Sequence, residues 1–197
     1  SLPFLMESDI LEAHKINEEA LKALQNEFSE EYKGILYGGF MATENGIKLI
    51  EYNARLGDPE AMNVLSLLES DLIDICMGIV SGSLDNCLVK FKKLATVCKY
   101  AVPNGYPTNP IKNKPINISK VNHQEGFFYA SVDIKNNDII ESGSRTVAFV
   151  GTGKTIAEAE LIAEKEISSV EGPLFHRKDI GTQSLINKKI SHMQSLR

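Results

Sequence analysis

The sequence contains no tryptophan, only three cysteines and no long hydrophobic run, and each absence narrows the possible functions. With eight Phe and six Tyr in 197 residues, few aromatic side chains are available to stack on nucleic-acid bases. The net charge of −5 leaves no excess of Lys and Arg for a polyanion or a membrane surface. No apolar segment approaches the roughly 18–20 residues of a membrane span. We therefore expect neither a nucleic-acid partner nor a membrane partner.

The cysteines, Cys76, Cys87 and Cys98, are odd in number and evenly spaced. Such a set suggests neither a disulfide framework nor a zinc site. Reduced thiols are typical of the cytosol, so we expect a cytoplasmic protein. The chain also begins with Ser1-Leu2-Pro3 rather than with Met, which suggests a point inside a longer polypeptide.

Among the features that are present, helical patterns mark the first half of the chain. Apolar residues recur at helical spacing across residues 10–28, and Ser8 and Asp9 are suitable N-cap residues for this helix. A second helical pattern covers residues 71–80. Between them, Asp58-Pro59-Glu60 is expected to open a further helix, because Pro and acidic residues favour a helical first turn.

Two apolar runs, 34–42 and 47–53, flank Asn45-Gly46 and predict a β-hairpin. Asn-Gly is the strongest short hairpin signal because both residues tolerate positive φ. Side chains alternate across a strand, so one face of the second run is expected to carry Ile47, Leu49, Glu51 and Asn53. The hairpin would then present two polar side chains at the end of its second strand.

The character of the sequence changes near residues 90–93, where we expect a domain boundary. Short β-type patterns follow at 95–102, 127–133 and 145–150. Helical patterns follow at 155–170 and 184–193. The sequence therefore predicts an α+β protein with two domains, 1–93 and 94–197. The first would combine antiparallel strands with packed helices, and the second would be small and β-rich with one or two helices.

Glu51 and Asn53 are the first candidates for chemistry. Oxygen-bearing side chains two residues apart on one strand face are separated by about 7 Å along the strand. Mg²⁺ prefers oxygen ligands and commonly shares its coordination shell with substrate phosphates. The pair therefore predicts a divalent-cation site, although Glu51 would also suit a plain exposed strand position opposite a lysine.

The residues after this pair add groups that suit anions and substrates. Arg55 offers a planar fork of donors for phosphate or carboxylate, and Gly57 allows a tight bend. Asp58 and Glu60 add two carboxylates at the expected helix start, where backbone N–H groups favour anions. A salt bridge between Arg55 and Asp58 and an ordinary helix cap would explain the same residues without any chemistry.

The segment is similar to the late signature of the phosphoribosylamine–glycine ligases (glycinamide ribonucleotide synthetases), a family of the ATP-grasp superfamily. The usual pattern is close to Glu-Phe-Asn-x-Arg-Phe-Gly-Asp-Pro-Glu. It corresponds here to Ile50-Glu51-Tyr52-Asn53-Ala54-Arg55-Leu56-Gly57-Asp58-Pro59-Glu60. Tyr52 and Leu56 are mild departures at apolar positions. Residues 32–40, 95–98, 105–107 and 175–181 also resemble the family, in the same order.

The resemblance implies that the chain is the C-terminal part of an ATP-grasp core followed by the family's C-terminal domain. It implies that ATP phosphorylates glycine, and that the amine of 5-phosphoribosylamine attacks the glycyl phosphate. The products would be glycinamide ribonucleotide, ADP and phosphate, in purine biosynthesis. The ATP-gripping N-terminal part of the family is missing from this sequence. We therefore expect the chain to be inactive alone and to need that part as its partner.

The resemblance also implies roles for individual residues. Glu51 and Asn53 would hold Mg²⁺ or Mn²⁺ at the ATP phosphates. The substrate-binding residues would be Arg55, Gly57, Asp58, Pro59 and Glu60. Arg55 and Asp58 would also be catalytic, with Arg55 facing an anion.

A competing phosphate-binding motif covers residues 148–155, which fit a relaxed Walker A pattern ending in Lys154-Thr155. A strand before it and a helix after it would suit a P-loop. However, bulky Phe149 and Val150 stand where the loop must wrap phosphate closely, and no later strand ends in a metal-binding Asp. A P-loop nucleotide-binding protein is the second hypothesis, and a non-catalytic interaction module is the third.

The charged residues near the end of the chain leave two roles open. His176, Arg177 and Asp179 would either brace the tail against the core or reach the active site.

Titration with ATP and metal separates the three hypotheses. The ligase hypothesis predicts that binding depends on Glu51 and Asn53, and the P-loop hypothesis predicts that it depends on Lys154 and Thr155. The interaction-module hypothesis predicts that it depends on neither pair.

Overall fold

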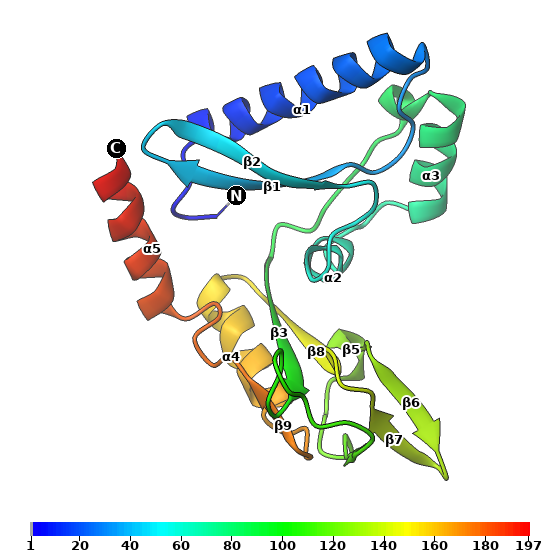
Figure 1. The fold of residues 1–197 in the computed structure, drawn as a ribbon, viewed down its shortest axis with the longest axis vertical. Helices are drawn as coiled ribbons and strands as arrows, with labels where there is room; N and C mark the ends of the chain where they lie inside the picture. The colour runs from blue at the N-terminus through cyan, green and yellow to red at the C-terminus, as the bar shows by residue number, and fades with distance from the viewer. Residues whose placement is uncertain (1) are drawn as a thin grey trace. The chain divides into compact units, whose positions relative to one another are not determined.

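Helices and antiparallel β-sheets alternate along the chain, as Figure 1 shows for the computed structural model, which describes residues 2–197. Ser1, the first residue of the predicted domain 1–93, lies outside the described residues. The elements of the first half are α1 (Glu7–Phe28), β1 (Tyr37–Thr43), β2 (Gly46–Asn53), α2 (Glu60–Leu65), α3 (Leu72–Ser81) and η1 (Leu84–Asn86). The second half contains β3 (Ala95–Pro103), β4 (Pro115–Ile116), η2 (Gln124–Gly126), β5 (Phe127–Tyr129), β6 (Val132–Lys135), β7 (Asp138–Glu141), β8 (Val147–Gly153), α4 (Ile156–Ile167), β9 (Leu174–His176) and α5 (Gln183–Leu196). These elements confirm the α+β prediction.

Two compact units share the described residues. The first contains residues 2–61, 68–91 and 186–197, and the second contains residues 62–67 and 92–185. The chain therefore passes between the units more than once. The division into domains 1–93 and 94–197 stays a prediction about functional domains.

In the first unit, α1 lies along the hairpin formed by β1 and β2 (Figure 1). The predicted helix 10–28 begins earlier than expected, at Glu7. The N-cap is Met6, whose backbone N–H donates to the Asp9 carboxylate at 2.8 Å. The prediction that Ser8 and Asp9 cap the helix is therefore wrong. Asp9 acts from inside the first turn, where a carboxylate also suits the positive end of the helix dipole.

The hairpin turn also differs from the prediction. Thr43 pairs with Gly46, so the chain turns through Glu44 and Asn45. Gly46 has a φ of 85°, whereas Asn45 is not among the residues with positive φ. Gly46 therefore takes the left-handed position that follows the turn, as in three-residue hairpin loops. The predicted hairpin is therefore confirmed, but only Gly46 of the Asn-Gly pair uses its tolerance of positive φ.

The helices that follow the hairpin agree with the predictions in position. The predicted helix at 71–80 is confirmed as α3, with the Asp71 side chain accepting from the N–H of Ile73 at 2.7 Å. Gly82 ends it with a φ of 69°. The helix expected at Asp58-Pro59-Glu60 is α2, which has only six residues.

The second unit is built around a four-stranded antiparallel sheet in the order β5-β8-β3-β9, with α4 packed against β3 and β8 (Figure 1). A smaller sheet has the order β4-β7-β6. The core between α4 and the larger sheet includes Val97, Phe149, Ala159, Ala163 and Ile167. The predicted helices at 155–170 and 184–193 are confirmed as α4 and α5.

One predicted strand is in fact two. Residues 127–133 form β5, which pairs with β8, and the start of β6, which pairs with β7 in the other sheet. The chain changes partners at Ala130 and Ser131, which a run of apolar residues cannot reveal. No helix among residues 2–197 is long and apolar enough to cross a membrane.

Candidate active site

A β-bulge in β2 decides which way the candidate site residues face. Phe40 pairs with Leu49 and Gly39 pairs with Glu51, so Ile50 is an extra residue in β2. A bulge of this kind changes the direction of the side chains that follow it. The alternation of the first half of β2 therefore does not continue into the second half.

Contacts with α1 identify the two faces of the hairpin. Before the bulge, Ile47 borders a cavity beside α1. After the bulge, Tyr52 faces α1, because its hydroxyl donates to the carbonyl oxygen of Ile16 at 3.4 Å. Glu51 and Asn53, which alternate with Tyr52, lie on the face away from α1. The prediction that they share a face with Ile47 and Leu49 is wrong, although they do share a face with each other.

The Glu51 and Asn53 side chains lie within hydrogen-bonding distance of one another. Asn53 Nδ2 donates to Glu51 Oε1 at 3.2 Å. Gly39, opposite Glu51, has no side chain to cover the carboxylate. The structure therefore brings this pair together at the end of β2, beside an uncovered stretch of backbone.

Tyr37 joins this pair from the neighbouring strand. It is directly opposite Asn53 in the β1–β2 ladder, and opposed residues project on the same face. Burial, the Glu60 charge, a hydrogen-bonding interaction with Glu60 and the Glu51 charge together raise the pKa of Tyr37. Tyr37 therefore lies close to both the Glu60 and the Glu51 carboxylates. No pattern in the sequence identifies this residue, because its pairing with Asn53 depends on the bulge.

The turn after β2 carries the remaining candidates. Arg55 is exposed, and its Nη1 donates to the carbonyl oxygen of Leu56 at 2.9 Å. This bond uses one of the five N–H groups of the guanidinium. Gly57 is buried, and Asp58 is exposed ahead of a cis bond to Pro59.

Glu60 begins α2, and its carboxylate turns back toward Gly57. A Cβ placed on Gly57 would lie 2.6 Å from Glu60 Oε2 and 3.2 Å from the Tyr37 ring. Glycine at this position therefore allows Glu60 and Tyr37 to approach the same point. Because α2 has only six residues, its dipole is a minor contribution to anion binding here.

The donor chemistry of Glu51 and Asn53 fits Mg²⁺ or Mn²⁺, which both accept carboxylate and amide oxygens. Among residues 2–197, no group of three or more His, Cys, Asp or Glu side chains is arranged to hold a metal ion. Two protein ligands leave room for phosphate oxygens and water, which is the usual arrangement for Mg²⁺ at a nucleotide. Asn53 would turn its amide oxygen toward such an ion.

The competing Walker A motif is not a loop in the structure. Gly151, Thr152 and Gly153 belong to β8 and pair with β3. The Lys154 N–H donates to Glu158 Oε2 at 2.8 Å, and the Thr155 hydroxyl accepts from the Glu158 N–H as the N-cap of α4. The backbone that would wrap a phosphate is thus used in a β-ladder and a helix cap, which removes the P-loop hypothesis.

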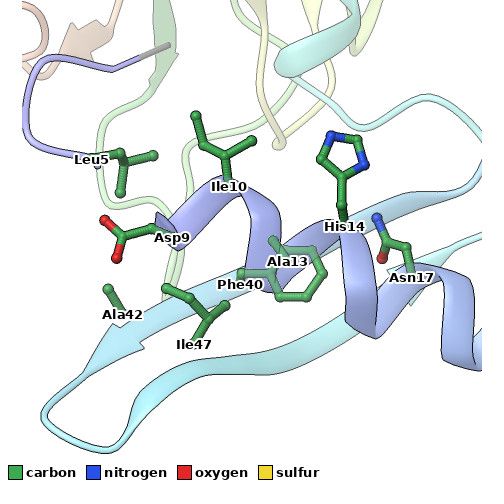
Figure 2. A pocket seen from close by; sticks show the side chains of 9 residues that line it. All are labelled: Leu5, Asp9, Ile10, Ala13, His14, Asn17, Phe40, Ala42 and Ile47. Carbon is green, nitrogen blue, oxygen red and sulfur yellow. The ribbon is translucent and has the colours of Figure 1, made fainter. Parts of the chain in front are cut away.

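A cavity of about 220 Å³ lies between α1 and the hairpin (Figure 2). The strand register puts it on the face opposite to Glu51 and Asn53. Its lining consists of Leu5, Asp9, Ile10, Ala13, His14, Asn17, Phe40, Ala42 and Ile47. Most of these side chains are apolar, and the Asp9 carboxylate is bonded to the Met6 N–H and paired with Arg197. The cavity is therefore mainly apolar and is separate from the Glu51–Asn53 pair.

The second unit contains charged residues that hold the fold together. His176 Nε2 lies 3.1 Å from Glu164 Oε1, which ties β9 to α4. Arg177 and Asp179 form two hydrogen bonds with each other, of 3.0 and 2.7 Å. The His176 contact favours the bracing role for that residue, whereas Arg177 and Asp179 form a local, exposed pair.

In sequence, the chain is similar to one family along most of its length. Residues 1–61 match the family model for "Phosphoribosylglycinamide synthetase, ATP-grasp (A) domain", and residues 96–183 match "Phosphoribosylglycinamide synthetase, C domain". A phosphoribosylamine–glycine ligase of Methanosarcina barkeri is 48% identical over 196 residues, covering 100% of this chain and 45% of the relative. One from Methanocaldococcus jannaschii is 48% identical over 199 residues, with the same coverage of 100% and 45%. The chain thus spans less than half the length of these relatives.

In structure, the chain is similar to the crystal structure of a phosphoribosylamine–glycine ligase from Thermotoga maritima. The TM-score is 0.75 and the identity is 27%, over 90% of this chain and 44% of that one. A urea carboxylase from Kluyveromyces lactis shares the fold alone, with a TM-score of 0.53 at 14% identity over 99% of this chain and 17% of that one.

Proposed function

The chain belongs to the phosphoribosylamine–glycine ligase family, and we propose on this basis that it contributes to the ATP-dependent ligation of glycine to 5-phosphoribosylamine. The reaction passes through glycyl phosphate and gives glycinamide ribonucleotide, ADP and phosphate. The observation that carries the proposal is the pairing of Glu51 and Asn53 on one face at the end of β2, inside the family signature. The family match over residues 1–61, which includes this strand, and the match over residues 96–183 support it.

Glu51 and Asn53 hold Mg²⁺ or Mn²⁺ through a carboxylate and an amide oxygen. When bound, the ion would neutralise the negative charge on the phosphate oxygens, which is the principal requirement of phosphoryl transfer. Their approach to one another, at 3.2 Å, supports this role because a single ion can contact both groups after a rotation of the Asn53 amide.

The turn after β2 binds substrate on the same side of the site. Arg55 presents its guanidinium to an anionic oxygen, and the exposed Asp58 lies three residues further along. Gly57, Pro59 and Glu60 form the wall of the pocket next to it. Arg55 and Asp58 act in catalysis by orienting the reacting groups and by balancing the charge that develops on them.

The test joins this chain to the part of the Methanosarcina barkeri relative that it does not span. Glycine-dependent ADP release and the mass of the nucleotide product are measured with Mg²⁺ and with Mn²⁺. We expect Glu51→Gln and Asn53→Leu each to lower kcat by at least about 100-fold, which corresponds to roughly 2.7 kcal/mol of transition-state stabilisation.

Lys154→Ala is the matched control, because it changes a charged residue in the competing motif. It should leave the rate within about two-fold of the unchanged protein. The purified 197-residue chain alone should form no product. A folded joined protein that makes no glycinamide ribonucleotide, or one that tolerates both changes at Glu51 and Asn53, would reject the proposed function.

A further inference from the structure

We propose that Tyr37 is a positioning residue of this site, which holds the Glu60 carboxylate beside Glu51 and Asn53 so that it can receive the amino group of a substrate. This inference rests on the proposed function and extends it to a residue outside the signature segment. Tyr37 lies in β1, sixteen residues before Asn53. Three observations support the assignment.

The first observation is the register of the hairpin. Tyr37 is paired with Asn53, and Gly39 is paired with Glu51. Paired residues share a face, so Tyr37 projects on the face of the proposed metal ligands. Without the extra residue Ile50, Tyr37 would be opposite Tyr52, and Glu51 and Asn53 would lie on the α1 face. The bulge therefore brings Glu51 and Asn53 to the face on which Tyr37 lies.

The second observation is the crowding around Gly57. A Cβ on Gly57 would lie 2.6 Å from Glu60 Oε2 and 3.2 Å from both Cδ1 and Cε1 of Tyr37. The carboxylate oxygen and the phenol ring thus lie against the same small region of backbone. Gly57 is buried, while Tyr37 and Glu60 are each only partly exposed. A long flexible Glu side chain held in this way has few alternative positions.

The third observation is electrostatic. The Glu60 and Glu51 carboxylates lie close enough to Tyr37 for their charges to act on its hydroxyl, and the Glu60 charge has the larger effect of the two. Donation from a neutral phenol satisfies one lone pair of the carboxylate without cancelling its charge. Glu60 therefore keeps an anionic oxygen for a cationic or amine-bearing group. Arg55, by contrast, suits the anionic end of a substrate.

The obvious alternative is that Tyr37 only packs the hairpin. A packing role depends on the ring and not on the hydroxyl, so Tyr37→Phe separates the two roles. Tyr52→Phe is a matched control, because Tyr52 is in the same hairpin and its hydroxyl donates to Ile16 on the opposite face. Both variants keep the ring, and neither is expected to unfold the hairpin.

The first arm of the experiment tests the contact in the 197-residue chain itself. Tyrosine is labelled with ¹³C at Cζ, and the signals are compared between the unchanged chain and Glu60→Gln. The signal of Tyr37 should shift, and that of Tyr52 should not. If the Tyr37 signal stays in place, the contact is absent and the proposal is wrong, whatever reaction the protein catalyses.

The second arm measures kinetics in the joined protein described above. Tyr37→Phe should raise the KM for glycine or for 5-phosphoribosylamine by about ten-fold, since loss of one hydrogen bond to a charged group is worth roughly 1.4 kcal/mol. The KM for ATP should stay within two-fold, and Tyr52→Phe should match the unchanged protein. The double variant Tyr37→Phe, Glu60→Gln should lose little more than Glu60→Gln alone.

Two kinetic results would overturn the proposal. One is an equal rise in the KM for all three substrates, and the other is full additivity of the two substitutions. An unchanged protein that makes no glycinamide ribonucleotide would reject the proposed function instead, and the labelled chain would still report whether Tyr37 contacts Glu60.

Discussion

Lys99 is a fully buried cation, and its neighbours explain how the fold accommodates it. Its Nζ lies 2.7 Å from Glu160, 2.6 Å from Glu164 and 3.0 Å from the carbonyl oxygen of Lys178. An ammonium has three N–H donors, so each donor has an acceptor. Burial tends to raise the pKa of Glu164, but the bonds and charges of Lys99 and His176 outweigh it and lower that pKa overall. The group therefore links β3, α4 and the segment after β9.

Replacing Lys99 with Met should destabilise the second unit strongly. The substitution leaves two carboxylates facing each other without a cation, and breaking a buried pair typically costs about 3–5 kcal/mol. We expect a loss of about 3 kcal/mol in the free energy of unfolding, the lower end of this range. The reason is that the side chains of Glu160 and Glu164 remain 13% and 29% exposed. Urea unfolding followed by circular dichroism measures the change. Lys120→Met, which removes an exposed partner of Glu171, should leave the midpoint almost unchanged. Equal effects of the two substitutions would contradict this account.

Glu166 makes the stability of the second unit depend on acid pH. Burial acts to raise the pKa of Glu166, but bonds from His123 and from the backbone N–H of Asn122 outweigh it, so the pKa lies below the ordinary value of 4.5. A depressed pKa contributes stability above the ordinary value, and that stability is lost as the pH falls through the lower, folded-state pKa. The free energy of unfolding should therefore fall as the pH is lowered from about 4.5.

The Glu166→Gln variant tests this dependence, because Gln cannot be protonated in this range. It should be less stable than the unchanged chain at pH 7. Its free energy of unfolding should also change less between pH 5 and pH 3. Parallel pH profiles for the two proteins would show that Glu166 is not the group responsible.

At the residue scale, site residues that are contiguous in the sequence could be predicted, whereas residues that folding brings together could not. Glu51, Asn53 and the turn after them could be found because they occupy one short signature. Tyr37 could not, since its pairing with Asn53 depends on a one-residue bulge at Ile50 that no sequence pattern reveals. Lys99 lies in an apolar run, where nothing in the sequence shows which carboxylates on α4 will reach it.

At the scale of elements, β8 and α4 pack so closely that one position requires glycine. A Cβ on Gly151 would lie 1.9 Å from the carbonyl oxygen of Ala159 and 2.7 Å from the N–H nitrogen of Ala163. Both contacts are with helix backbone, which cannot move aside as a flexible side chain could. The glycine that resembled part of a Walker A motif thus serves helix–sheet packing.

Gly151→Ala should destabilise the chain by about 1–3 kcal/mol or more, the usual cost of overpacking. Gly34→Ala is a suitable control, because Gly34 is exposed and its new Cβ would meet only the side chain of Tyr32, at 3.3 Å. Thermal unfolding of both variants gives the comparison. A Gly151→Ala protein as stable as Gly34→Ala would mean that α4 shifts freely on the sheet.

Elements with strong periodic patterns were predicted well, and short or irregular ones were not. The patterns in 10–28, 71–80 and 155–170 located α1, α3 and α4 because amphipathic spacing persists over several turns. The two-residue strand β4 and the three-residue strand β9 carry too few residues for a pattern. Their positions depend on partners distant in the sequence, β7 and β3.

At the scale of the whole molecule, the two units differ in how much apolar surface they bury. Among the described residues, Ile47 and Met193 are the buried apolar side chains of the first unit, and the others belong to the second. The first unit instead exposes large apolar side chains: Phe28 at 68%, Met41 at 56%, Ile50 at 60%, Ile73 at 72%, Val80 at 70% and Leu88 at 73%. Burial of apolar area is the main favourable contribution to folding, so the first unit should be the less stable.

Hydrogen exchange tests this difference directly, because amide protection follows the local free energy of opening. In the 197-residue chain, the amides of β3 and β8 should exchange slowest, and those of β1 and β2 should exchange at least about ten-fold faster, a difference of roughly 1.4 kcal/mol. Mass spectrometry of peptides from the hairpin and from the four-stranded sheet gives the two rates. In the joined protein, the hairpin should become slower if the added part covers Met41 and Ile50, while β3 and β8 should change little. Equal protection of both units in the 197-residue chain would contradict this expectation. It would mean that the smaller buried apolar area of the first unit does not lower its stability.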